Sequence, residues 1–177
     1  YITLKDTEAM GPCWARYLIQ QEWKGEQYFL QLDSHMRFVK NWDEILINNY
    51  NQCPHIKSIL SQYPSNYTIS KNKSLDSKEE NWELDKIRSS IYIEKWNTVD
   101  GFFRIQSNYS NNTFTEPIPS KAVSACFLFG SSELIKDAAV DPYLPFLFFG
   151  EEMDLTLRLF TKGWYFYTPY NHIAFTT

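Results

Sequence analysis

The length, composition and charge of this chain exclude several classes of protein. Its 177 residues predict one domain, and a net charge of −4 gives no reason to expect binding to nucleic acid. The three cysteines form neither a disulfide framework nor a zinc-binding pattern, which favours a reducing compartment. Because the sequence shows neither a long apolar run nor a signal peptide, we expect a soluble protein with no membrane segment.

The first third of the sequence predicts helices around one buried strand. A helix begins at Pro12, which suits a first turn, and ends before Gly25. The alternating bulky and apolar residues of 28–32 predict a strand. Two more helices are expected, one at 41–50, where apolar residues repeat on one face, and one at 55–63.

The remainder of the sequence alternates strands, loops and one further helix. Its most polar stretch, residues 70–86, predicts a solvated loop or insertion. The other elements expected there are strands at 90–93, 102–105 and 123–129, a polar loop at 107–115, an aromatic loop at 141–149, a helix from Glu151 that ends at Gly163, and a strand at 164–167. Because helices and strands are mixed along the chain, we expect an α/β fold.

An acidic residue and a histidine follow the first predicted strand. Asp33 and His35 are two residues apart on an extended segment, so their side chains point the same way. A carboxylate and an imidazole at the carboxyl end of a strand can hold a divalent cation such as Mn²⁺ or Mg²⁺, and ligands bind at that edge in open α/β sheets. Taken alone, the triplet is more often a turn-capping Asp beside an incidental His. His172, taken alone, is likewise more often a structural histidine.

A second acidic motif lies far downstream. Gly150 lets the backbone turn, and Glu151 and Glu152 open a helix whose N-terminus favours negative charge. The two carboxylates are therefore either first-turn helix charges or part of a pocket, where one accepts a proton or a hydrogen bond from a hydroxyl group. The aromatic loop before them suits packing against a sugar or pyrrolidine ring, although Phe146 and Phe148 taken singly are more typical of a core.

Taken together, these blocks resemble a known family. The strings that carry the resemblance are Gly-Pro-Cys-Trp-Ala-Arg at 11–16, Gln-Leu-Asp-Ser-His-Met-Arg-Phe at 31–38, Phe-Phe-Gly-Glu-Glu at 148–152 and Gly-Trp at 163–164. They are similar to the cytoplasmic polypeptide N-acetylglucosaminyltransferases of glycosyltransferase family 60, whose best-known members attach GlcNAc to a hydroxyproline of a ubiquitin-ligase adaptor protein. No motif anchors residues 66–116 to that family.

The resemblance implies a GT-A fold, in which an α/β sheet holds a metal-dependent sugar-nucleotide site, and a cytoplasmic location. Carried over by position, Asp33 and His35 form the metal and diphosphate motif, which His172 completes, with Mn²⁺ preferred to Mg²⁺. Glu151 and Glu152 match the acidic pair on the acceptor side. The further residues implied to bind substrate are Arg16, Ser34, Cys126, Phe149 and Gly150.

The chain departs from the family pattern in two places. Cys126 stands where we expect a glycine that lines the donor sugar, which puts the donor preference in question. GT-A domains also place their first strands and base-binding surface before the metal motif, yet only 32 residues precede Asp33. We therefore expect residues 1–177 to form a partial GT-A catalytic domain that lacks the N-terminal nucleotide-binding strands and the uridine pocket.

The function expected from the resemblance is transfer of GlcNAc from UDP-GlcNAc to a polypeptide hydroxyl, hydroxyproline above all. Family members retain anomeric configuration, so Glu152, or else Glu151, is expected to orient the acceptor hydroxyl rather than act as an inverting base. Two alternatives stay open. An inverting glycosyltransferase that builds a surface polysaccharide shares the same helix motif, and a non-catalytic module that binds glycan or protein would keep the same scaffold.

Overall fold

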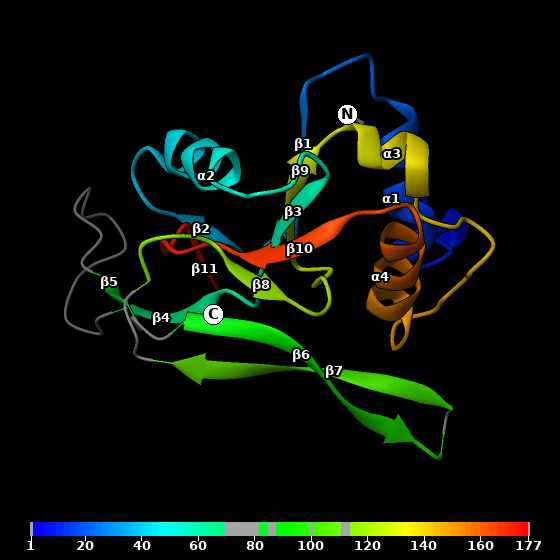
Figure 1. Ribbon diagram of the computed structural model, residues 1–177. Helices are drawn as coiled ribbons and strands as arrows, with labels where there is room; N and C mark the ends of the chain where they lie inside the picture. Colours follow the sequence, from blue (N-terminus) through cyan, green and yellow to red (C-terminus); the bar gives the residue numbers. More distant parts are fainter. Residues whose placement is uncertain (1, 70–81, 85–87, 100, 111–113, 177) are drawn as a thin grey trace.

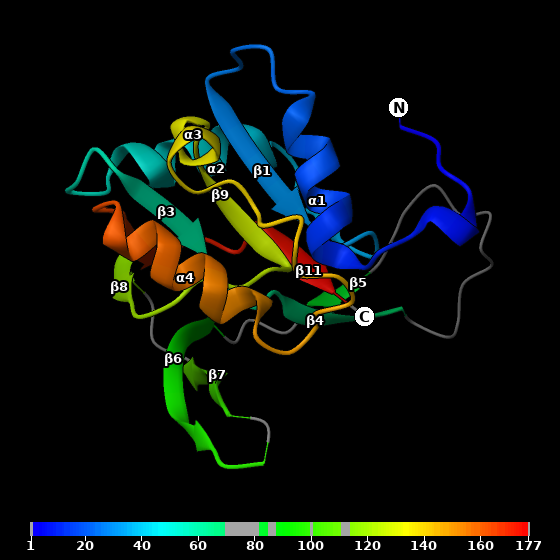
Figure 2. The same ribbon diagram turned by 90° about the vertical axis from the view of Figure 1, so that its right-hand side faces the viewer.

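The structure, a computed structural model, describes residues 2–69, 82–84, 88–99, 101–110 and 114–176 (Figures 1 and 2). These residues form two β-sheets, a β-hairpin and a set of helices. The helices are η1 (Asp6–Glu8), a short 3₁₀-helix, and α1 (Pro12–Gln21), α2 (Trp42–Asn51), α3 (Glu133–Ala138) and α4 (Glu151–Thr161). Across the described ranges, none of these helices combines the length and apolar character needed to cross a bilayer. The insertion predicted at 70–86 falls almost entirely outside the described residues.

The larger sheet has the strand order β1-β9-β3-β10-β8. Its strands are β1 (Tyr28–Leu32), β9 (Phe127–Ser131), β3 (Ser58–Ser61), β10 (Tyr165–Thr168) and β8 (Ile118–Ser120). Strands β3 and β10 pair in parallel, and the other neighbours pair antiparallel. Because β1 and β3 point the same way, the segments that follow them emerge at the same edge of the sheet.

Helices cover both faces of this sheet, which makes it the middle layer of an α/β fold (Figure 1). Ile59 of β3 packs in a cluster with residues of α3 and α4, whereas its neighbour Leu60 packs in a second cluster with Leu46 of α2. Phe166 and Tyr167 of β10 divide between the same two clusters. This alternation is what strands buried on both faces require, and it confirms the predicted fold class.

A smaller sheet and a hairpin complete the described structure. The smaller sheet has the order β2-β11-β4-β5, with β2 (Arg37–Phe38), β11 (Ala174–Thr176), β4 (Ser65–Ile69) and β5 (Trp82–Leu84). Strands β6 (Arg88–Asn97) and β7 (Phe102–Ser110) form a twisted hairpin that projects away from the helical layers (Figures 1 and 2).

Most of the predicted elements are confirmed, but the helix expected at 55–63 is wrong. That segment contains β3, in which Ile59 and Leu60 are fully buried against opposite helical layers. Because β3 lies between β9 and β10, both Ile59 and Leu60 are buried. The free energy gained from this burial outweighs the local preference for a helix. The strand expected at 123–129 begins later, at Phe127, and the loop expected from residue 107 is a continuation of β7 as far as Ser110.

Candidate active site

Most of the candidate residues gather around a cavity of about 660 Å³, at the edge of the sheet where β1 and β3 end. Figure 2 shows the arrowhead of β1 directed toward the first turn of α1, and the start of α4 contributes the opposite wall. The predicted site residues that line this cavity are Arg16, Asp33, Cys126, Phe149, Gly150, Glu151 and Glu152. A second cavity of about 340 Å³ shares Asp33 and Cys126 with the first and adds His35.

Arg16 joins three segments that are distant in the sequence. Its Nη1 lies 2.5 Å from Oε2 of Glu151, and its Nη2 lies 3.8 Å from Oδ1 of Asp33. The Glu151 side chain is only 10% exposed, and this burial raises the pKa of its carboxyl group, against the opposing effect of Arg16. Arg16 therefore fixes the start of α4 next to the segment that follows β1.

Glu152 is held by groups outside its own helix. Its Oε1 accepts a hydrogen bond from the backbone N–H of Ala125 at 2.8 Å, and its Oε2 accepts one from the hydroxyl of Tyr63 at 2.7 Å. These contacts orient the carboxylate toward the cavity that Tyr63 and Glu152 both line. A charge that merely favoured the helix N-terminus would need neither partner.

Asp33 and His35 both line the smaller cavity, but Ser34 and His35 form a turn, so the expectation of an extended segment there is wrong. The backbone N–H of Asp33 donates to the carbonyl of Cys126 at 3.3 Å, which anchors the segment after β1 to the segment before β9. The Asp33 side chain is 35% exposed, and His35 is exposed. Among the described residues, no three His, Cys, Asp or Glu side chains are grouped so that they could hold a metal by themselves.

The structure does not bring His172 to this pair. Strand β11 runs antiparallel to β2, with Phe175 opposite Arg37, and Val39 N–H donates to the carbonyl of Ile173. Thr176, at the other end of β11, is the residue that lines the smaller cavity. Four residues of extended chain span about 13 Å, so the register places His172 away from the predicted metal motif, where its ring stacks on Phe175 at 5.8 Å.

Cys126 occupies the boundary between the two cavities. Its Sγ lies 2.8 Å from Oγ of Ser124. Burial raises the pKa of the thiol to about 12, and the negative charges of Asp33 and Glu152 add to the effect. At neutral pH Cys126 is therefore an uncharged wall residue and not a nucleophile.

The aromatic loop is anchored at one point and otherwise exposed. Phe146 N–H donates to the carbonyl of Met10 at 2.9 Å, and a Cβ at Gly11 would come within 2.8 Å of the Phe146 backbone. Phe146 and Phe148 are 72% and 68% exposed, so the expectation that they fill the core is wrong. Phe149 is 65% exposed and packs edge-on against Phe148, where both rings line the larger cavity.

Sequence reasoning missed some of the residues that complete the walls. Tyr63 lies in the segment that was expected to be helical, so no pattern pointed to it. Arg104 and Gln106 come from β7, within the region that no motif anchored. Ser34, predicted to bind substrate, is exposed and lines neither cavity.

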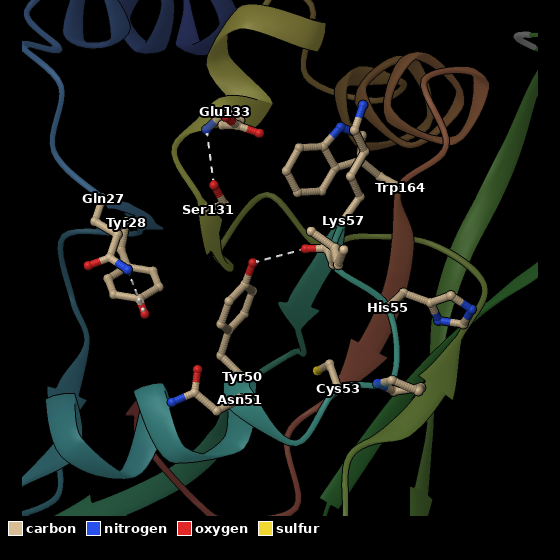
Figure 3. A pocket seen from close by; sticks show the side chains of 12 residues that line it. Gln27, Tyr28, Tyr50, Asn51, Cys53, His55, Lys57, Ser131, Glu133 and Trp164 are labelled. Atoms are coloured by element: carbon tan, nitrogen blue, oxygen red, sulfur yellow. Dashed lines mark hydrogen bonds between the residues drawn. The ribbon is translucent and has the colours of Figure 1, made fainter.

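A third cavity, of about 400 Å³, lies at the opposite end of β3, next to the end of α2 (Figure 3). Two of its polar side chains, Lys57 and His55, are paired with neighbours. Lys57 Nζ lies 2.7 Å from Oδ2 of Asp137, which also accepts a hydrogen bond from Trp164 Nε1 at 2.9 Å. The His55 ring stacks on Tyr165, and its Nδ1 lies 2.6 Å from the hydroxyl of Tyr167. These contacts join β3 to β10 and α3, which is a structural role.

Comparison with known proteins agrees with the geometry. The model of a family described as "Glycosyltransferase (GlcNAc)" matches residues 1–177. No curated protein matches the chain. A similar solved structure is that of GalNAc-T7 with UDP, GalNAc and Mn²⁺, with a TM-score of 0.63 and 16% identity. The match covers 94% of this chain and 30% of that one, so the chain spans less than a third of the length of the solved protein. This structural similarity confirms the GT-A fold.

Proposed function

Because the chain belongs to the glycosyltransferase (GlcNAc) family, we propose that its site transfers N-acetylglucosamine from UDP-GlcNAc to a hydroxyl group of a polypeptide. The observation that carries the proposal is the convergence of Arg16, Asp33 and the Glu151–Glu152 pair on one cavity. The Mn²⁺ and UDP in the GalNAc-T7 structure support a nucleotide-sugar donor and a divalent metal.

In this proposal Asp33 and His35 hold the metal. A carboxylate and an imidazole fit Mn²⁺ better than Mg²⁺, which prefers oxygen ligands throughout. When bound, the metal supplies positive charge for the diphosphate that departs. Asp33 and His35 would supply only two ligands to the metal, so we expect nucleotide and metal to bind together.

Arg16 provides a second positive charge at the site. Its guanidinium lines the same cavity as Asp33, where it can stabilise the negative charge that develops on the departing diphosphate. Glu151 acts as a positioning residue, because its buried carboxylate holds Arg16 at 2.5 Å and fixes the direction of the guanidinium.

Glu152 orients the acceptor. The Tyr63 hydroxyl and the Ala125 N–H each donate one hydrogen bond to the Glu152 carboxylate. Because a carboxylate can accept about four hydrogen bonds, Glu152 can accept another from the acceptor hydroxyl. The hydroxyl oxygen bonds to C1 of the sugar as the bond from C1 to the diphosphate oxygen breaks, and the proton passes to that oxygen. We propose that the hydroxyl attacks the face of C1 that the diphosphate leaves, so the configuration at C1 is retained without a covalent intermediate.

The acceptor is proposed to be hydroxyproline in a polypeptide. The exposed rings of Phe148 and Phe149 line the cavity next to Glu151, and aromatic faces pack well against a pyrrolidine ring. A cytoplasmic setting is part of the proposal, and the free thiols of Cys13, Cys53 and Cys126 support it.

Turnover of UDP-GlcNAc tests the proposed function. The full-length chain with Mn²⁺ is expected to release UDP, and Asp33→Ala to release it about 10²-fold more slowly. Asp43→Ala, which removes an exposed carboxylate from the first turn of α2, serves as the matched control and is expected to behave as wild type. Equal rates for Asp33→Ala and wild type, or no release by wild type, would contradict the proposal.

A further inference from the structure

Strand β7 lines both cavities of the site with consecutive residues. Phe103, Arg104, Ile105 and Gln106 line the larger cavity, and the run continues through Ser107 in the smaller one. Successive side chains of a strand point to opposite faces of its sheet, so a cavity against one face would contact alternate residues. A run of consecutive residues indicates that the cavities follow the edge of β7, where its backbone is presented.

That edge of β7 can pair with an additional β-strand. Among the described strands, only β6 is hydrogen-bonded to β7, which leaves the other edge of β7 without a partner among those strands. The strand is nine residues long, and its hairpin lies outside the two sheets, with part of β7 close to α4 (Figure 2). An edge strand presents a row of N–H and C=O groups that pair readily with an extended chain.

The side chains around this edge suit a polypeptide. Trp96 and Phe103 pack edge-on near the tip of the hairpin and are 52% and 43% exposed. Across the larger cavity the exposed ring of Phe149 lies 5.0 Å from the Arg104 guanidinium, so the hairpin and the aromatic loop form facing walls. Between them, the backbone of β7 provides directional pairing and the aromatic rings provide apolar contacts for side chains.

We propose that the acceptor polypeptide binds in an extended conformation, as an added β-strand along the outer edge of β7. This inference rests on the proposed function, because it names how the acceptor of that same site is recognised. Strand addition aligns the acceptor backbone with Ile105 and Gln106, which line both cavities, and brings one acceptor hydroxyl to Glu152. The enzyme therefore selects acceptor segments that are extended, not helical or already paired in a sheet.

A hydroxyproline in the acceptor determines which alternate residues of the added strand form hydrogen bonds with β7. Within an added strand, the N–H and C=O of every second residue face the neighbouring strand. Hydroxyproline has no N–H and so occupies a position whose backbone faces away from β7. Residues one or three positions from the hydroxyproline then donate and accept hydrogen bonds with β7, and residues two positions away do not.

Backbone N-methylation of an acceptor peptide tests which of its residues form hydrogen bonds with β7. The probe is a nine-residue peptide with one central hydroxyproline, methylated at one backbone nitrogen at a time and assayed for GlcNAc transfer by the full-length chain. Methylation one residue after or three residues before the hydroxyproline is expected to raise KM about tenfold or more, which is the loss of one hydrogen bond. Methylation two residues before or after it is the matched control, because it adds the same methyl group on the solvent side.

Amide exchange on the enzyme gives an independent measurement. Binding of the unmethylated peptide is expected to protect every second amide of β7, those that face away from β6, and to leave the others unchanged. Transfer that proceeds with no alternation in KM and no alternating protection overturns strand addition while the proposed function stands. Absence of any transfer to the unmethylated peptide, together with absence of UDP release, contradicts the proposed function itself.

Discussion

The hydroxyl of Tyr63 donates to the Glu152 carboxylate at 2.7 Å, across the 89 residues that separate them in the sequence. Tyr63 follows β3 and Glu152 belongs to the first turn of α4, so this bond joins the central sheet to the helix that carries the acidic pair. Tyr63→Phe is expected to lower GlcNAc transfer about tenfold, because Glu152 loses the group that orients one of its oxygens. The measurement is kcat/KM for transfer by the full-length chain.

Tyr170→Phe is the control for that substitution. It removes a hydroxyl that accepts a hydrogen bond from Gln52, in an exposed pair remote from both site cavities. The control should leave transfer unchanged. If both variants lose activity equally, the Tyr63 bond has no specific role in the reaction.

The two acidic residues have different proposed roles, because Glu152 orients the acceptor hydroxyl and Glu151 positions Arg16. Glu152→Gln is expected to keep its Tm and lose transfer about 10²-fold or more, since an amide no longer provides a charged acceptor for the hydroxyl. Glu133→Gln, an exposed acid in the first turn of α3, controls for the loss of a helix N-terminal charge and should cost less than about 1 kcal/mol. Transfer by Glu152→Gln at the wild-type rate would remove Glu152 from the mechanism.

Glu151 predicts a specific dependence of stability on pH. Burial raises the pKa of its carboxyl group above the ordinary value of 4.5, so in the window above 4.5 the folded state binds more protons at this group than the unfolded state. The contribution of Glu151 to the free energy of unfolding therefore falls as pH rises from about 4.5 through the folded-state pKa, and is constant above it. Urea unfolding at a series of pH values should show this fall in wild type and not in Glu151→Gln. Parallel curves for the two proteins would refute the assignment.

Metal binding distinguishes the sequence prediction from the structure. In titration calorimetry of the full-length chain with UDP present, Mn²⁺ should bind measurably more tightly than without UDP, and Asp33→Ala should abolish that gain. His172→Ala should retain it, because the register of β11 against β2 separates position 172 from Asp33 and His35. Loss of the gain in His172→Ala would show that this histidine reaches the metal after all.

Local patterns predicted the parts of the site that depend on spacing. The turn at Gly150 with the following acids placed Glu151 and Glu152 at the first turn of a helix. Asp33 and His35 do line one cavity, but His35 lies in a turn and not on the extended segment that their spacing was taken to indicate. The parts that depend on distant pairing were not predictable. Strand β3 exists because β9 and β10 flank it, and those strands come from residues far later in the chain. The mistaken helix at 55–63 therefore concealed Tyr63.

The same limit applies to the hairpin and to the aromatic loop. Nothing in the sequence of β7 indicates that its residues would line the site, since this depends on how the hairpin packs beside α4 and the cavities. Phe146 and Phe148 have the composition of core residues, yet the anchor at Gly11 and Met10 holds their loop at the surface. In both cases tertiary contacts, not local preference, decide which residues are presented to a ligand.

Mass spectrometry of matched peptides can show whether this site joins GlcNAc to a polypeptide hydroxyl. The full-length chain, UDP-GlcNAc and Mn²⁺ are incubated with a peptide that contains one hydroxyproline and with the same peptide that contains proline. We predict a mass increase of one N-acetylhexosamine on the hydroxyproline peptide alone, because proline lacks the nucleophilic oxygen. Modification of neither peptide, nor of Ser and Thr peptides under the same conditions, would contradict it.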